Sequence, residues 1–172
     1  MQKILLDVSH SLQRANSDCL PICAMMVLKY WGKEISYTRL TKILGTRSFG
    51  TPSDNMQRLN QLGVEVTLTK LLPTEIHDYL QQKTPVIAFV STADLPYWHV
   101  DTDHAVVVIG MDKDLVYIND PYFSLAPQEV SHASFELSLL KFNYKCAVIE
   151  KATQKLSEKL FQLIKKRWKA KD

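Results

Sequence analysis

Apolar residues in the first half of the chain recur at the three-to-four-residue spacing of a helix. This spacing predicts a first apolar helix that begins at Cys19, after an N-cap at Asp18, and ends near Gly32. The other elements expected before residue 81 are helices over 37–44, 51–62 and 72–80 and a strand over 64–68. The first half of the chain is therefore expected to be mainly helical.

The second half changes to short runs of apolar and β-branched residues, which favour strands. Asp112-Lys113-Asp114 has the size of a hairpin turn between the second and third of these runs, so those two strands are expected to pair antiparallel. The runs cover residues 85–90, 104–111, 115–118 and 144–149. Helices followed by an antiparallel sheet predict an α+β fold.

Composition fits one globular domain with reduced cysteines. The 172 residues are 46% hydrophobic and 23% charged, which is ordinary for a domain with its own core. The chain has no run of 18 apolar residues, so no transmembrane helix is expected. The N-terminal residues lack the pattern of a signal peptide. Cys19 and Cys23 lie one helical turn apart, a poor geometry for a disulfide. The low, odd number of cysteines therefore favours a cytoplasmic protein.

Positive charge concentrates at the C-terminal end of the chain. Residues 151–172 contain eight lysines and arginines against Glu158 and Asp172, a net charge of +6, and leave −3 on residues 1–150. Nucleic-acid binding by residues 1–150 is therefore not expected. Leucines and Trp168 share one face of the C-terminal segment, which predicts a basic amphipathic helix. This helix either packs on its own domain or binds a membrane surface or a membrane protein.

The position of Cys19 makes it a candidate nucleophile. Unpaired N–H groups and the helix dipole favour an anion in the first turn of a helix, and a thiol attacks a carbonyl as the thiolate. His104 opens one expected strand and Asp120 ends the next, so the hairpin brings their side chains together. The carboxylate can then hold one imidazole nitrogen while the other faces Cys19. Gln13, six residues before the thiol, can join the Cys19 N–H in an oxyanion hole.

The remaining cysteines and histidines have simpler interpretations. Cys23 and Cys146 lie in apolar segments and are expected in the core. Zinc is disfavoured because Cys19 and Cys23 lack a second pair of ligands at the usual spacing, and neither a metal nor a cofactor is expected. Trp98 and His99 lie in a loop between two expected strands and are candidate substrate contacts, although His99 can equally be a solvated side chain.

Taken together, these motifs resemble the bacteriocin-processing cysteine peptidases of the papain-like superfamily, which cut after double-glycine leaders. The likeness covers about residues 8–150. It rests on Gln13, the Asp18-Cys19 pair, the apolar run after His104, and Asp120-Pro121 at the end of the next strand. The resemblance implies a papain-like fold over residues 1–150, with an N-terminal helical lobe and a C-terminal antiparallel sheet lobe.

The same resemblance implies roles for individual residues. Cys19 corresponds to the nucleophile, His104 to the base and Asp120 to the group that orients the base. Gln13 corresponds to the oxyanion donor, and the implied substrate is a protein or peptide. The expected activity is therefore cleavage of a peptide bond by a Cys-His-Asp triad, with processing of a leader peptide as one candidate reaction.

The residues after Cys19 differ from those of the transporter-linked members, which usually have Gly at the next position. Leu20-Pro21 is similar to the free-standing relatives, whose substrates are less uniform. We therefore expect a free-standing cysteine peptidase, although the same residues also support acyl transfer. The alternative from another functional class is a catalytically silent module of the same fold that binds a peptide or leader without cutting it.

Overall fold

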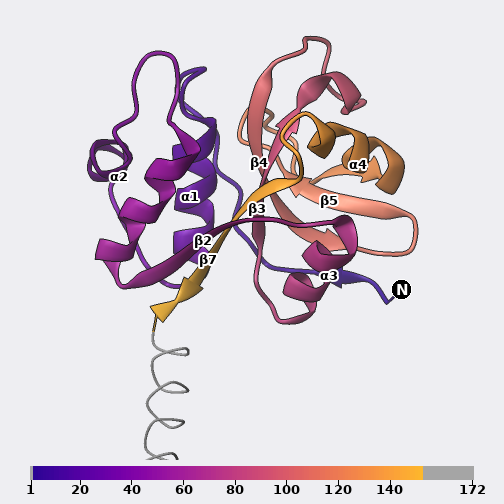
Figure 1. Ribbon diagram of the computed structural model, residues 1–172, viewed down its shortest axis with the longest axis horizontal. Coiled ribbons are helices and arrows are strands. Elements are labelled where there is room, and N and C mark those ends of the chain that lie inside the picture. The colour runs from indigo at the N-terminus through magenta and orange to yellow at the C-terminus, as the bar shows by residue number, and fades with distance from the viewer. Residues whose placement is uncertain (1, 153–172) are drawn as a thin grey trace, which may run out of the picture.

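An antiparallel sheet forms the centre of the structure, a computed structural model that describes residues 2–152 (Figure 1). Its strands are β1 (Ile4–Leu5), β2 (Val64–Lys70), β3 (Val86–Ser91), β4 (Asp103–Met111), β5 (Leu115–Asn119), β6 (Gln128–Ser131) and β7 (Lys145–Lys151). Six of them lie in the order β2-β7-β3-β4-β5-β6, and β1 pairs with the end of β4. The hairpin expected around Asp112–Asp114 is confirmed as β4 and β5.

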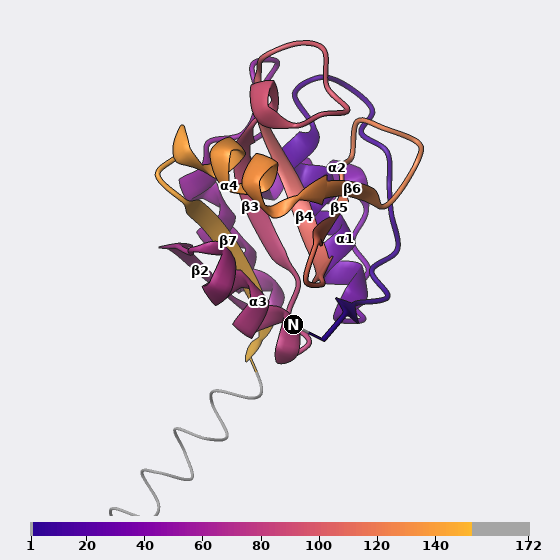
Figure 2. The same cartoon turned by 90° about the vertical axis from the view of Figure 1, so that its right-hand side faces the viewer.

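Helices cover both faces of this sheet (Figure 2). They are α1 (Cys19–Tyr30), α2 (Tyr37–Leu44), the 3-10 helix η1 (Ser53–Leu62), α3 (Pro73–Gln81), the short 3-10 helix η2 (Thr92–Asp94) and α4 (His132–Leu140). We call α1, α2 and η1 the helical lobe, and the strands with α3 and α4 the sheet lobe. The expected α+β class with these two lobes is confirmed.

Burial on both faces explains the continuous apolar runs of the central strands. Along β4, Val107 packs in the core cluster that contains α1, whereas its neighbours Val106 and Val108 pack in the cluster that contains α3 and α4. Successive side chains of a strand point to opposite faces, so a strand covered on both sides needs apolar residues at every position. The core therefore holds β4 rigidly beside α1, and β4 carries His104.

Three elements that the sequence pattern did not predict complete the sheet lobe: β1, β6 and α4. β1 lies against β4 because Gly110 has no side chain, and a Cβ at that position would collide with the backbone of Ile4. This pairing starts the N-terminal segment on a path that leads toward the end of β5.

The C-terminal helix expected over residues 151–172 lies outside the described residues except at its first two positions, and its expected start is wrong because Lys151 is the last residue of β7. Within residues 2–152, no helix is both long enough and apolar enough to span a membrane.

Candidate active site

Cys19 is the first residue of α1 and is a free, partly exposed thiol. Asp18 precedes the helix as expected, but its side chain does not cap it. The Asp18 carboxylate instead accepts hydrogen bonds from the Tyr37 hydroxyl, at 2.7 Å, and from the Ala15 N–H, at 3.1 Å. No described residue accepts a hydrogen bond from the Cys19 N–H. This N–H therefore stays available at the start of the helix, where a negative charge is favoured.

The β4–β5 hairpin brings His104 and Asp120 together. His104 is the second residue of β4 and Asp120 directly follows β5. Both side chains are buried, and His104 Nε2 lies 2.8 Å from Asp120 Oδ1. Because Nε2 is bound to the carboxylate, Nδ1 is the ring nitrogen left to face the thiol.

The electrostatics of the pair follow from these contacts. Burial alone would lower the pKa of His104, but hydrogen bonds and charge interactions with Asp120 and Cys19 raise it to about 9. Burial would likewise raise the pKa of Asp120, but the His104 contact, with hydrogen bonds from Tyr122 N–H and Trp98, lowers it. Both shifts favour an imidazolium beside a carboxylate at neutral pH.

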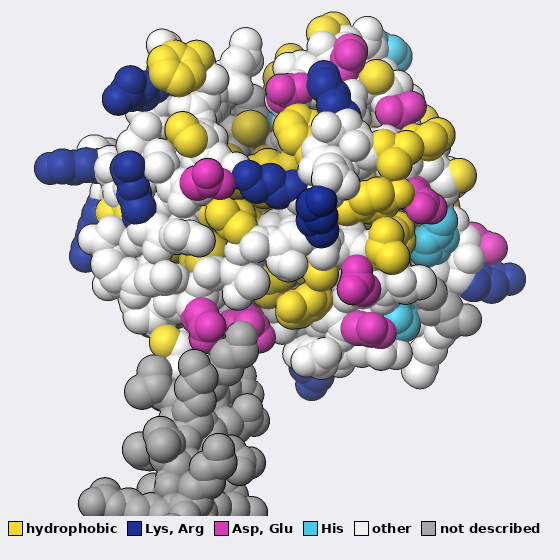
Figure 3. Space-filling view, in the orientation of Figure 1, with side chains coloured by type: hydrophobic (Ala, Val, Ile, Leu, Met, Phe, Trp, Pro, Cys, Tyr) yellow, Lys and Arg dark blue, Asp and Glu magenta, His cyan; other side chains and the backbone are white. Residues whose placement is uncertain are grey.

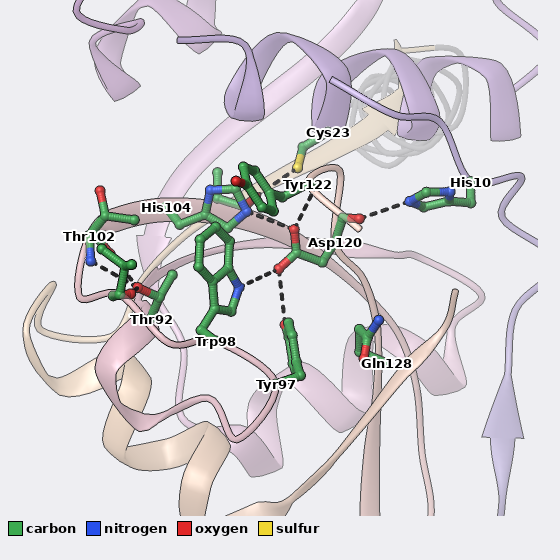
Figure 4. Close-up of polar contacts among 12 residues, drawn as sticks. His10, Cys23, Thr92, Tyr97, Trp98, Thr102, His104, Asp120, Tyr122 and Gln128 are labelled. Carbon is green, nitrogen blue, oxygen red and sulfur yellow. Dashed lines mark hydrogen bonds and ion pairs between the residues drawn. The ribbon is translucent and has the colours of Figure 1, made fainter. Parts of the chain in front are cut away.

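Asp120 collects hydrogen bonds from three further groups (Figure 4). Oδ2 accepts from the Trp98 indole N–H at 2.9 Å and from the Tyr97 hydroxyl at 3.1 Å, and Oδ1 accepts from the Tyr122 N–H at 2.9 Å. The Trp98 ring also packs edge-on against His104, with ring centroids 5.1 Å apart. The carboxylate is therefore held from several directions, which fixes the His104 ring as well.

The N-terminal segment contacts Asp120 and the residue that precedes it. Asn119 donates its side-chain N–H to the Val8 carbonyl, and His10 Nε2 lies 2.8 Å from the Asp120 carbonyl oxygen. His10 was not singled out by the sequence, since it matches no motif and lies 110 positions from Asp120. These contacts hold the backbone on either side of the carboxylate.

Gln13 lies at the end of the same segment. Its backbone N–H donates to the Pro121 carbonyl over 2.7 Å, which places residue 13 beside the Asp120-Pro121 pair. Its Oε1 is buried and has no hydrogen-bond partner among the described residues. The structure therefore brings the Gln13 backbone to the site, and its role as an oxyanion donor stays a prediction.

A cleft of about 270 Å³ opens beside the thiol, between the helical lobe and the sheet lobe. Its lining residues are Cys19, Leu20, Phe49, Thr51, Ser53, Phe89, Asp103, His104, Ala105, Phe142 and Lys145. Trp98 and His99, the candidate substrate contacts, do not belong to this lining. Trp98 binds Asp120 instead, and His99 is exposed on the loop.

The other two cysteines are buried, as expected. Burial raises the pKa of Cys23 well above its usual value, and its thiol donates to the Ala105 carbonyl at 3.2 Å. Burial also raises the pKa of Cys146 to about 12. Among residues 2–152, no group of three or more His, Cys, Asp or Glu side chains is arranged to hold a metal ion.

Comparison with known proteins identifies the family. The family model described as the peptidase C39 family matches residues 7–139. The chain belongs to this family. The C39 match includes Gln13, Cys19, His104 and Asp120, and it confirms the resemblance read from the sequence. No curated protein sequence matches the chain.

Solved structures similar to this C39 chain share its fold. A C39-like peptidase structure from Bacillus anthracis superposes with a TM-score of 0.74 at 17% identity, covering 88% of this chain and 98% of that one. The peptidase domain of Streptococcus ComA, an ABC transporter in a quorum-sensing pathway, gives 0.69 at 22% identity, with 83% and 98% covered. A double-glycine motif protease from an AMS/PCAT transporter, in complex with its leader peptide, gives 0.68 at 18% identity, with 88% and 99% covered.

Proposed function

We propose that this C39 chain is a cysteine peptidase that cleaves a peptide bond through Cys19, His104 and Asp120. The observation that carries the proposal is the buried His104–Asp120 pair beside a free thiol at the start of α1, at the edge of a cleft. A nucleophile, a base and a group that orients the base are the parts that acyl transfer from a peptide requires.

Attack begins with the Cys19 sulfur on the substrate carbonyl carbon. The raised pKa of His104 supports transfer of the thiol proton to its ring, so the sulfur attacks as thiolate and a C–S bond forms. The oxyanion that develops can accept hydrogen bonds from the Cys19 N–H and the Gln13 amide. His104 then gives its proton to the leaving amine as the C–N bond breaks.

Hydrolysis of the resulting thioester completes the cycle. Neutral His104 takes a proton from water, the hydroxide oxygen attacks the thioester carbon, and the C–S bond breaks to release the acid and regenerate the Cys19–His104 pair. Asp120 keeps its charge throughout and orients His104, because the groups around it stabilise the ionised carboxylate.

A peptide substrate is supported by one of the related structures, a protease solved with its leader peptide. Leader processing is therefore the first reaction to test. The alternative, a silent module that binds a peptide without cutting it, predicts binding without new peptide termini.

Digestion of a peptide library tests the proposal. Wild-type protein and Cys19→Ser are incubated with peptides derived from a bacterial proteome, together with synthetic leader peptides that end in Gly-Gly, and new termini are identified by mass spectrometry. We expect new termini with wild type and none with Cys19→Ser. Cleavage that persists in Cys19→Ser contradicts the proposed nucleophile. Peptide binding by a wild-type protein that cuts nothing supports the silent module.

A further inference from the structure

The cleft beside the catalytic thiol has a mainly apolar lining. Leu20 and Phe89 are buried in its walls, and Ala105 lies next to His104 on β4. Phe142 adds a second aromatic ring, and Phe49 stands at the rim with 77% of its surface exposed. Hydrophobic side chains also gather where the two lobes meet on the face in Figure 3. A ligand that covers both the exposed aromatic side chain and the apolar wall beside it removes apolar surface from water, which stabilises the complex.

The polar side chains of the lining already have partners within the chain. The Lys145 ammonium binds the Ser53 hydroxyl and the Asp54 carboxylate. Asp103 pairs with Lys141 at 2.9 Å.

The Thr51 hydroxyl also has a partner in the chain, because it forms a hydrogen bond of 2.7 Å with the Thr46 hydroxyl. His104 is bound to Asp120. Apart from the Cys19 thiol, the cleft therefore offers a ligand apolar surface rather than polar groups without partners.

We propose that this cleft binds a large apolar side chain at one of the two substrate residues that precede the cut. The inference rests on the proposed peptidase activity, since it concerns the same site. Cys19 and His104 form part of the cleft wall, so the side chain that fills it belongs to a residue close to the scissile carbonyl. Two glycines before the cut, as in the double-glycine leaders of the peptidases that the sequence resembles, would leave this apolar volume empty. The substrate class is therefore a peptide with Phe, Leu or Met near its cleavage point.

Labelling of Cys19 by peptide chloromethyl ketones tests this proposal. The thiolate displaces chloride from the methylene carbon next to the ketone, and the ketone of the probe takes the place of the scissile carbonyl. The probes are Ala-Ala peptides that end in Gly-Gly, Phe-Gly, Gly-Phe, Lys-Gly or Gly-Lys, and the lysine probes control for size without apolar character. Each labelling rate is divided by the rate with iodoacetamide, which measures the reactivity of the thiol towards a reagent that carries no peptide.

We expect one of the two phenylalanine probes to label Cys19 at least about tenfold faster than the Gly-Gly probe and the lysine probes. Fastest labelling by the Gly-Gly probe overturns the inference and leaves the proposed function intact. Equal relative rates for all peptide probes overturn the inference and also contradict peptide recognition at this site.

Phe49 provides the matched variant, because it lies at the rim and its replacement leaves the buried core unchanged. Phe49→Ala should reduce the preference for the phenylalanine probe severalfold, and Phe49→Leu should restore part of it. Leu125→Ala is the control, since Leu125 is 73% exposed and does not belong to the cleft lining. An equal loss of preference in Phe49→Ala and Leu125→Ala contradicts the proposed binding surface.

Discussion

The Trp98 indole N–H donates to Oδ2 of Asp120 over 2.9 Å, on the carboxylate oxygen that His104 does not use. The Tyr97 hydroxyl donates to the same oxygen. Two adjacent residues of a loop therefore stabilise the carboxylate from the side opposite the histidine. Trp98 acts in this account as a positioning residue, which influences the thiol through Asp120 and His104.

Replacing Trp98 by Phe should raise the pKa of the Asp120 carboxyl, because a ring remains against His104 while the N–H is lost. A hydrogen bond to a charged group contributes roughly 1.5–3 kcal/mol. The pKa can be followed by carbon NMR of the Asp120 carboxyl, and labelling of Cys19 should slow in parallel. Tyr97→Phe is the matched variant and should shift this pKa in the same direction. A lower melting temperature with an unchanged carboxyl pKa would mean that Trp98 has only a structural role.

The raised pKa of His104 predicts how stability depends on pH. The folded pKa is about 9 against an ordinary value of 6.5, so the contribution of the His104 imidazolium is complete below about 6.5 and is lost as pH rises through about 9. Asp120→Asn should lower the His104 pKa and flatten this dependence. Proton NMR of the imidazole ring and urea unfolding at several pH values measure the two effects. A His104 pKa that stays near 9 in Asp120→Asn would contradict the assigned cause.

Variants of His104 and His99 test which of the two histidines is the base. His104→Ala should reduce turnover of a library-derived substrate by at least ~10²-fold, because the proton acceptor is lost. Asp120→Ala should be damaging but less severe, because orientation is lost rather than the acceptor. His99→Ala should leave kcat nearly unchanged, since His99 is exposed on the loop and does not line the cleft. An inactive His99→Ala beside an active His104→Ala would show that the wrong histidine has been assigned.

Much of the fold could be predicted because the central strands are buried on both faces. Their unbroken apolar runs, including those of β4 and β7, stand out in the sequence. β1 and β6 were missed because they are short and lie at the periphery of the sheet, where few positions need to be apolar. α4 was missed because both its buried and its exposed positions include apolar residues, so no clear polar face marks the helix.

Part of the site could also be predicted from the sequence. Helix starts and strand ends can be located from sequence, and they indicated Cys19, His104 and Asp120. The contact between His10 and the Asp120 carbonyl joins residues 110 positions apart and depends on the path of the N-terminal segment, which no local pattern specifies. The hydrogen bond from Trp98 to Asp120 depends on the conformation of a loop, so the sequence indicated only that this residue was of interest.

The basic C-terminal segment gives a further prediction. Residues 153–172 can be deleted without shortening β7, which ends at Lys151. If the segment binds membranes, the full chain should bind vesicles that contain phosphatidylserine at low salt, and the deletion should abolish binding, since each basic residue near such a surface contributes about 1 kcal/mol. Sedimentation with the vesicles measures this. A full chain that does not bind them contradicts the membrane interpretation, and a melting temperature lowered by deletion favours a segment packed on the domain.

The central claim is that Cys19 is activated by His104, and thiol mapping tests it most directly. Wild-type protein and His104→Ala are treated briefly with substoichiometric iodoacetamide at neutral pH, and each cysteine is quantified by mass spectrometry. We predict that Cys19 is labelled first in wild type, that Cys23 and Cys146 are protected because burial raises their pKa values, and that His104→Ala labels Cys19 much more slowly. Equal labelling of Cys19 and Cys146, or an unchanged rate in His104→Ala, would contradict the account.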